Sequence, residues 1–252
     1  MDDEIQTYGS GFAAVYDAFM DNIPYDDWHA YVRKLLCGQG VADGIVVELG
    51  CGTGNMTKRL AEDGYNMIGI DMSAEMLEYA RDKCPENVLL LQQDMRELDL
   101  YGTAAAMVCV CDGMNYLLEP EDLRRTFERV HLFLDEGGIF LFDLKTAYFY
   151  ETQLGSRTIT DNREDATLIW ENAYDADAML HEYLVTIYEL ADEKRDLFAR
   201  REEYHRQRAY PWKTVKKILQ ETGFSVKAVY NAFTENAPEE DSERLYFVAK
   251  RI

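Results

Sequence analysis

The chain has 252 residues, and 26 Lys and Arg against 47 Asp and Glu leave a formal charge of −21. This length suffices for one large α/β domain, with or without an insert, and a hydrophobic content of 47% with 12% aromatics excludes a disordered chain. The charge disfavours nucleic acid as a partner, because such binding rests largely on Lys and Arg neutralising phosphates.

Targeting segments and metal motifs are not predicted from the sequence. The start, MDDEIQTYGSGF, is acidic and polar, and no apolar run approaches the roughly 20 residues that cross a bilayer. Five cysteines form no CxxC pair and lie near no histidine cluster: Cys37, Cys51, Cys84, Cys109 and Cys111. We therefore expect a soluble, cytoplasmic protein with no membrane contact, reduced thiols and no metal site. The oligomeric state is not predicted.

Strands and helices alternate along most of the chain. Two helices are expected in the first 40 residues, GFAAVYDAFM and YDDWHAYVRKLLCG. Apolar strands then alternate with amphipathic helices, and Gly137 and Gly138 are expected to end the last helix of this series. The predicted strands are residues 44–49, 65–70, 87–92, 104–111 and 139–144, and the helices are 55–64, 73–84 and 120–134. This rhythm predicts a mostly parallel sheet with helices on both faces.

The rhythm changes at about residue 146. Three long stretches between 146 and 211 alternate with a period of two: TLIWENAY, MLHEYLVTIYEL and LFARREEYHRQRAY. They predict an inserted antiparallel β meander. A helix at 212–223 and a hairpin of residues 224–231 and 244–251 then return to the α/β pattern. We expect residues 1–145 and 212–252 to form one domain, with a helical entry segment at 1–40, and residues 146–211 to form a lid that selects a substrate.

A glycine-rich turn follows the first predicted strand. In VVELGCGTGN, Gly50, Gly52 and Gly54 stand between the strand and a helix, a geometry that lets the backbone press against a ligand. A dinucleotide site would place its third glycine at position 55, which is Asn55. Glu48 at the strand end suits an ammonium group better than a pyrophosphate.

Acidic residues at two further strand ends narrow the ligand. Asp71 is placed to accept hydrogen bonds from both hydroxyls of a ribose. Asp94 can accept the exocyclic amine of an adenine, whose ring would pack on Met95. A ligand with an adenine, a ribose and an amine near Glu48 is S-adenosylmethionine.

The motifs VVELGCGTGN, GIDMS, QQDM and VCDGMNYL resemble those of class I S-adenosylmethionine-dependent methyltransferases, including small bacterial members with an inserted β lid. The resemblance implies a Rossmann-like sheet of seven strands with a reversed last strand. It implies that Cys111 offers its carbonyl to the amino group of the cofactor and that Met72 packs on the base. The other implied cofactor contacts are Glu48, Gly50, Gly52, Gly54, Asp71, Asp94 and Met95. YGSGFAAVYD is similar to the family's entry helix, which implies that Tyr8 and Tyr16 close over the sulfonium.

The expected reaction is in-line methyl transfer to a small-molecule acceptor. Asp112 and Asn115 in CDGMNYL, and His205 in EEYHRQRAY, are the candidate catalytic residues. For two of them a structural role is the alternative: a turn residue for Asn115 and an exposed strand residue for His205. Five arginines between positions 195 and 208 suit either a carboxylate-bearing acceptor or cross-strand ion pairs.

Three other functions stay open. An RNA-base methyltransferase shares the fold, although the charge disfavours it. A nicotinamide oxidoreductase would need the third glycine that this turn lacks. A protein that binds S-adenosylmethionine without turnover would have the same binding residues. Neither the acceptor nor the methylated atom follows from the sequence.

Overall fold

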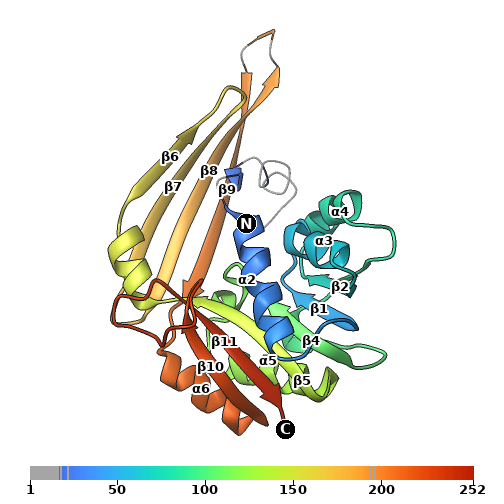
Figure 1. Ribbon diagram of the computed structural model, residues 1–252. Coiled ribbons are helices and arrows are strands. Elements are labelled where there is room, and N and C mark those ends of the chain that lie inside the picture. The colour runs from blue at the N-terminus through green and yellow to red at the C-terminus, as the bar shows by residue number, and fades with distance from the viewer. Residues whose placement is uncertain (1–16, 18, 22, 193, 196) are drawn as a thin grey trace.

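The computed structural model describes residues 17, 19–21, 23–192, 194–195 and 197–252. A seven-stranded sheet with helices on both faces forms the core, and a separate four-stranded sheet projects from it (Figure 1). None of the described helices has the length and apolar character that would let it span a bilayer.

The seven-stranded sheet has the order β10-β11-β5-β4-β1-β2-β3. Its strands are β1 (Ile45–Leu49), β2 (Asn66–Asp71), β3 (Leu89–Gln92), β4 (Ala104–Cys109), β5 (Leu134–Lys145), β10 (Phe224–Asn231) and β11 (Arg244–Arg251). The first five are parallel, whereas β11 pairs antiparallel with both β5 and β10. The predicted fold class is confirmed, including the reversed last strand.

Helices cover both faces of this sheet. The helices are α2 (Tyr25–Gly38), α3 (Asn55–Glu62), α4 (Ala74–Lys83), α5 (Pro120–Phe133) and α6 (Trp212–Glu221), with short turns η1 (Met95–Glu97) and η2 (Gly113–Tyr116). Apolar residues of α2 and α3 pack on one face and those of α5 and α6 on the other. Burying apolar surface on both sides is what a parallel sheet requires, so the continuous apolar strands follow directly from this layering.

The glycines at 137 and 138 do not end a helix, as was expected. Helix α5 stops at Phe133, and both glycines lie inside β5. There the register with β4 is irregular, since Ala104 pairs with Leu134 and Ala106 with Ile139. Gly137 has a φ of 76°, a left-handed conformation that glycine adopts easily. The two glycines therefore lie in a β-bulge of β5.

The insert forms a four-stranded antiparallel sheet in the order β6-β7-β8-β9. After the short turn η3 (Phe149–Leu154) come β6 (Thr158–Asn162), β7 (Ala166–Asp175), β8 (Leu180–Asp192) and β9 (Leu197–Arg208). Three strands were expected; β6 was missed. This edge strand is short and mostly exposed on both faces, so its sequence lacks the alternation that reveals a half-buried strand.

Asp17 contacts the core and Phe19 contacts the four-stranded sheet. The Asp17 carboxylate accepts hydrogen bonds from Thr53 at 2.7 Å and from Lys83 at 2.6 Å, both in the core. Phe19 packs on Val185 of β8. Figure 1 shows the start of the described chain between β9 and α3, so this segment ties the two sheets together.

Candidate functional site

A cavity of about 1170 Å³ lies at the carboxyl ends of the central strands. Its wall includes residues that directly follow β1, β2, β3 and β4, and it also includes Tyr204 and Arg206 of β9. Ligands of open parallel sheets bind in this place, outside the carboxyl ends of the strands. The four-stranded sheet therefore contributes one side of the cavity that the core sheet opens.

The glycine-rich turn lines the cavity through its first two glycines. Gly50 and Gly52 have φ values of 69° and 53°, which bring their backbone against the cavity. A Cβ atom at Gly50 would lie 3.7 Å from the Cε atom of Met95. Gly54 instead faces helix α4, where an added Cβ would lie 2.7 Å from Cys84 Sγ. The third glycine permits close packing of the turn on α4.

Asp71 ends β2 and fixes the same turn. Its carboxylate accepts hydrogen bonds from the backbone N–H groups of Gly52 at 2.8 Å and Ser73 at 2.9 Å. Burial raises the pKa of this carboxyl despite these bonds. A carboxylate offers about four acceptor positions, and the backbone bonds do not fill all of them, so Asp71 can also accept from a ligand in the cavity that it lines.

Glu48 lies at the bottom of the cavity and is only 3% exposed. The hydroxyl of Thr57 donates a hydrogen bond to it. Burial raises the pKa of Glu48 to about 8, with Asp71 adding to the shift. A buried carboxyl of this kind is stabilised in its charged form by a cationic ligand.

The third strand end carries Asp94, which binds Arg96. The Arg96 guanidinium donates to both carboxylate oxygens of Asp94, at 3.0 and 2.6 Å, and the Arg96 backbone N–H donates at 2.8 Å. Burial would raise the pKa of Asp94, but these bonds lower it on balance. Arg96 was not expected here. Met72 and Met95 line the cavity beside this pair, as does Cys111.

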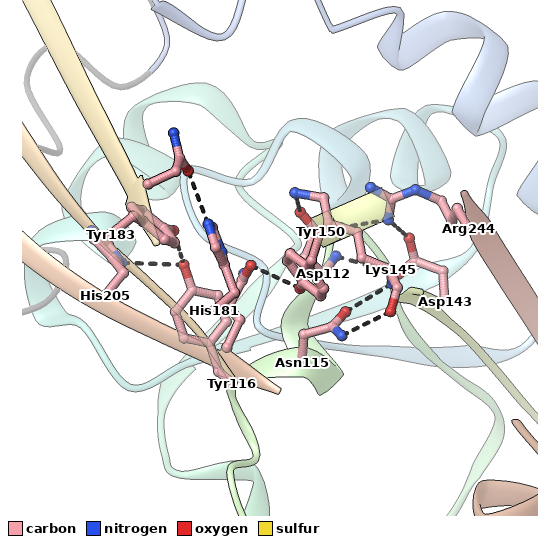
Figure 2. Close-up of polar contacts among 12 residues, drawn as sticks. Asp112, Asn115, Tyr116, Asp143, Lys145, Tyr150, His181, Tyr183, His205 and Arg244 are labelled. Atoms are coloured by element: carbon pink, nitrogen blue, oxygen red, sulfur yellow. Dashed lines mark hydrogen bonds and ion pairs between the residues drawn. The ribbon is translucent and has the colours of Figure 1, made fainter. Parts of the chain in front are cut away.

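Asp112 belongs to a buried group of four charges beyond β4 (Figure 2). Lys145 Nζ lies 2.6 Å and an Arg244 nitrogen 2.5 Å from its carboxylate, and Arg244 also contacts Asp143. Burial alone would raise the pKa of Asp112, yet the two cations lower it, whereas burial raises the pKa of Asp143 to about 6. Asp112 has a φ of 74°, a conformation that these contacts hold in place.

Asn115 is fully buried and bonded to backbone groups on both sides of the insert. Its side-chain oxygen accepts the N–H of Lys145 at 3.0 Å. Its amide nitrogen donates to the carbonyls of Lys145 at 3.2 Å and Arg208 at 2.8 Å. Lys145 precedes the insert and Arg208 ends β9, so Asn115 joins the two places where the chain enters and leaves the four-stranded sheet.

His205 is 1% exposed and contacts the core through Tyr116. The Tyr116 hydroxyl lies 3.2 Å from His205 Nδ1 and 2.8 Å from the hydroxyl of Tyr183 (Figure 2). The carboxylate of Glu203 lies 3.3 Å from His205 Nε2. His205 is therefore not at an exposed strand position, because η2 covers this face of β9 and its Tyr116 contacts the imidazole.

The five arginines between positions 195 and 208 form ion pairs. Arg200 pairs along β9, Arg201 and Arg206 pair across to β8, and Arg195 pairs with Asp192 at the turn between the two strands. Arg208 donates to the backbone carbonyls of Leu118 and Ala178. Arg206 also lines the cavity.

Tyr8 and Tyr16 lie outside the described residues, so their contacts stay predictions. Sequence reasoning missed Tyr116, Tyr183 and Glu203. A signal existed for two of them. Tyr116 directly follows Asn115, and Glu203 shares a strand face with His205 because every second residue of a strand points to the same face. Within the described ranges, no group of three or more His, Cys, Asp and Glu side chains is arranged to hold a metal ion.

Comparisons with known proteins agree on one family. The sequence profile described as "Methyltransferase domain" matches residues 46–138. The putative methyltransferase YqeM of Bacillus subtilis (strain 168) is 35% identical over 244 residues, or 96% of each chain.

Two solved structures are similar over nearly the whole chain. An S-adenosylmethionine-dependent methyltransferase from Clostridium acetobutylicum ATCC 824 has a TM-score of 0.84 and 25% identity, covering 96% of this chain and 98% of that one. CalS10 from Micromonospora echinaspora, described as an S-adenosylmethionine-bound amino pentose methyltransferase, has a TM-score of 0.74 and 19% identity, covering 98% and 99%. The second likeness shows a shared fold, insert included.

Proposed function

Because the chain belongs to the class I S-adenosylmethionine-dependent methyltransferases, we propose that it methylates a small-molecule acceptor held between the core and the four-stranded sheet. The observation that carries this proposal is the mixed wall of the cavity. Strand ends of the core supply the cofactor side, and β9 supplies Tyr204 and Arg206. An acceptor bound there is enclosed by protein on two sides, and excluding water while aligning the acceptor is what methyl transfer needs.

S-adenosylmethionine fits the residues present. Its ammonium and sulfonium groups suit the buried Glu48, whose raised pKa falls when a cation is bound. The free acceptor positions of Asp71 suit a ribose, and Met72 and Met95 suit an adenine ring. Both carboxylate oxygens of Asp94 are already bound by Arg96, so an adenine amine would share these oxygens with Arg96. The cofactor supplies an activated methyl group, and the chain binds, orients and shields it.

We assign different roles to the three candidate catalytic residues. Asp112 and Asn115 are positioning residues, because neither lines the cavity and each binds other parts of the chain. Asp112 holds the turn after β4, and Asn115 holds the base of the insert. His205 contacts a cavity-lining tyrosine and is the one suited to proton transfer.

Two observations favour a small acceptor over RNA. The formal charge of −21 opposes binding of a phosphate backbone. CalS10, which shares the fold over the insert, is described as an amino pentose methyltransferase. Residues 146–211 are accordingly the part of this chain that selects the acceptor.

The test has two steps. Calorimetry should detect S-adenosylmethionine binding and no comparable binding of NAD. Incubation with methyl-labelled S-adenosylmethionine and a pool of cellular small molecules should then give S-adenosylhomocysteine and a product heavier by one methylene group, which mass spectrometry identifies. Labelling of folded RNA instead would favour an RNA methyltransferase. Binding with no S-adenosylhomocysteine in either mixture would favour a protein that binds without turnover.

A further inference from the structure

Four side chains from the core and the insert form a continuous chain of contacts that ends at the cavity. Tyr183 of β8 pairs across the sheet with His205 of β9, and their rings stack 4.6 Å apart. Tyr116 of η2 contacts both, at 2.8 Å from the Tyr183 hydroxyl and 3.2 Å from His205 Nδ1. Glu203 lies on the same strand face, 3.3 Å from His205 Nε2.

The chemistry of these groups sets the direction of the hydrogen bonds. An imidazole that accepts at Nδ1 carries its proton on Nε2, the nitrogen that lies 3.3 Å from the Glu203 carboxylate. Nδ1 then accepts from the Tyr116 hydroxyl. The Tyr116 oxygen can accept in turn from Tyr183, whose pKa burial raises well above its ordinary value. Asp112 and Glu203 are the acidic residues whose charge acts on Tyr183.

Only one of the four residues reaches the cavity. Tyr116 is part of its wall, together with Cys111 and Gly113 from the turn after β4. His205 and Glu203 are 1% and 5% exposed. A proton leaving a bound acceptor would therefore meet Tyr116 first.

We propose that Tyr116 is a catalytic residue that takes the acceptor's proton and passes its own to His205, which Glu203 stabilises as a cation. The proposal rests on the proposed function and extends it to an acceptor class. An acceptor that needs this relay carries a proton on its nucleophile at neutral pH, as an amine or a hydroxyl does.

The step balances in atoms and charge. The lone pair of the acceptor's nitrogen or oxygen forms the new bond to the methyl carbon, while the carbon–sulfur bond breaks and leaves its electron pair on sulfur. The acceptor's proton moves to the Tyr116 oxygen as the Tyr116 proton moves to His205 Nδ1. The resulting imidazolium faces the Glu203 carboxylate, and the extra proton later returns to water.

The test uses a ligand pair and needs no acceptor. Sinefungin carries an amine-bearing carbon in place of the methyl-bearing sulfur of S-adenosylmethionine, whereas S-adenosylhomocysteine has nothing there. If Tyr116 faces the reacting position, its oxygen accepts from the sinefungin ammonium. Calorimetry on the full chain should then show Tyr116→Phe weakening sinefungin about tenfold while leaving S-adenosylhomocysteine unchanged.

Tyr210→Phe is the matched control. It also removes a buried hydroxyl, one that donates to the Leu117 carbonyl next to Tyr116, and it lies outside the chain of contacts. It should change both affinities alike. Equal losses of both ligands in Tyr116→Phe would show a structural role and overturn the proposal. Failure of the unaltered protein to bind either ligand would instead overturn the proposed function.

The imidazole supplies a second readout. Nitrogen NMR of the four histidines, with His205→Asn identifying the resonance, should show His205 Nδ1 unprotonated at neutral pH. Tyr116→Phe should shift that Nδ1 resonance and leave the other histidines unchanged. A proton found on Nδ1, or a resonance insensitive to Tyr116→Phe, would overturn the relay even if the ligand affinities behaved as expected.

Discussion

The two sides of the cavity are built in different ways. The cofactor side comes from one stretch, residues 48–96, in which each strand end delivers a short motif. The proposed acceptor side brings Tyr116 of η2 together with Tyr204 and Arg206 of β9, and Tyr183 and His205 contact Tyr116 from outside the cavity. Backbone groups form much of the cofactor side, whereas long side chains form the acceptor side. The cofactor side is therefore set by local geometry, whereas the acceptor side depends on how the two sheets are joined.

The connection between the core and the four-stranded sheet is polar and buried. Asn115 binds the main chain at both ends of the insert, and Lys145 reaches Asp112 beside it. Asp17 and Phe19 add a second connection between the core and the four-stranded sheet. If the sides are as separate as this arrangement indicates, changes in one should spare the other.

Removing the insert should have the largest effect. Replacing residues 147–207 by a short Gly/Ser linker keeps Lys145 and Arg208, whose carbonyls bind the same Asn115 amide, so the linker spans a small gap. The remaining core should bind S-adenosylmethionine within about tenfold of normal by calorimetry and form no S-adenosylhomocysteine. A folded core that no longer bound the cofactor would show that the insert belongs to the cofactor side.

Removing one of the buried charges at this connection should have the next largest effect. Arg244→Ala leaves Asp112 and Asp143 without their shared cation, and such losses cost about 3–5 kcal/mol of stability. Urea unfolding measures this change. Arg200→Ala, which removes an exposed ion pair with Glu202, should leave the midpoint unchanged. Similar midpoints for the two variants would contradict a structural role for the buried group.

On the cofactor side, Asp71→Ala should weaken S-adenosylmethionine binding at least about tenfold, because each charge-assisted bond to a ribose hydroxyl contributes about 1.5–3 kcal/mol. Calorimetry gives the affinity and thermal unfolding checks the fold. The matched variant Glu203→Gln, on the acceptor side, should keep normal cofactor affinity. The ribose assignment fails if Asp71→Ala binds normally.

Glu48 predicts a smaller, pH-dependent effect. Its pKa is about 8 in the folded chain against an ordinary 4.5, so its contribution to stability is fully present below pH 4.5 and is lost as pH rises to about 8. A bound cation favours the charged form, so cofactor affinity should rise several-fold from pH 6 to pH 8. Glu48→Gln should flatten both slopes, in thermal unfolding and in calorimetry. An unchanged pH slope in either would place the titration elsewhere.

The sequence by itself determined the core and the cofactor side. Alternating strands and helices predicted the sheet, and the strand-end motifs at Glu48, Gly50, Asp71 and Asp94 predicted the place of the cavity. These features are readable because each depends on a few consecutive residues. Even here Gly54 proved to face α4, and Arg96 to bind Asp94, since neighbouring elements decide what a turn residue touches.

Only the tertiary structure decided the acceptor side. Nothing in the sequence near Arg244 marks it as the partner of Asp112, because 132 positions separate them and their pairing depends on β11 lying next to β5. An exposed position was one possibility for His205, and its burial follows from η2, which covers this face of β9 and contacts His205 through Tyr116. Local patterns fix which residues share a strand face. The packing of elements that are distant in the sequence decides which strand face is buried and which element covers it.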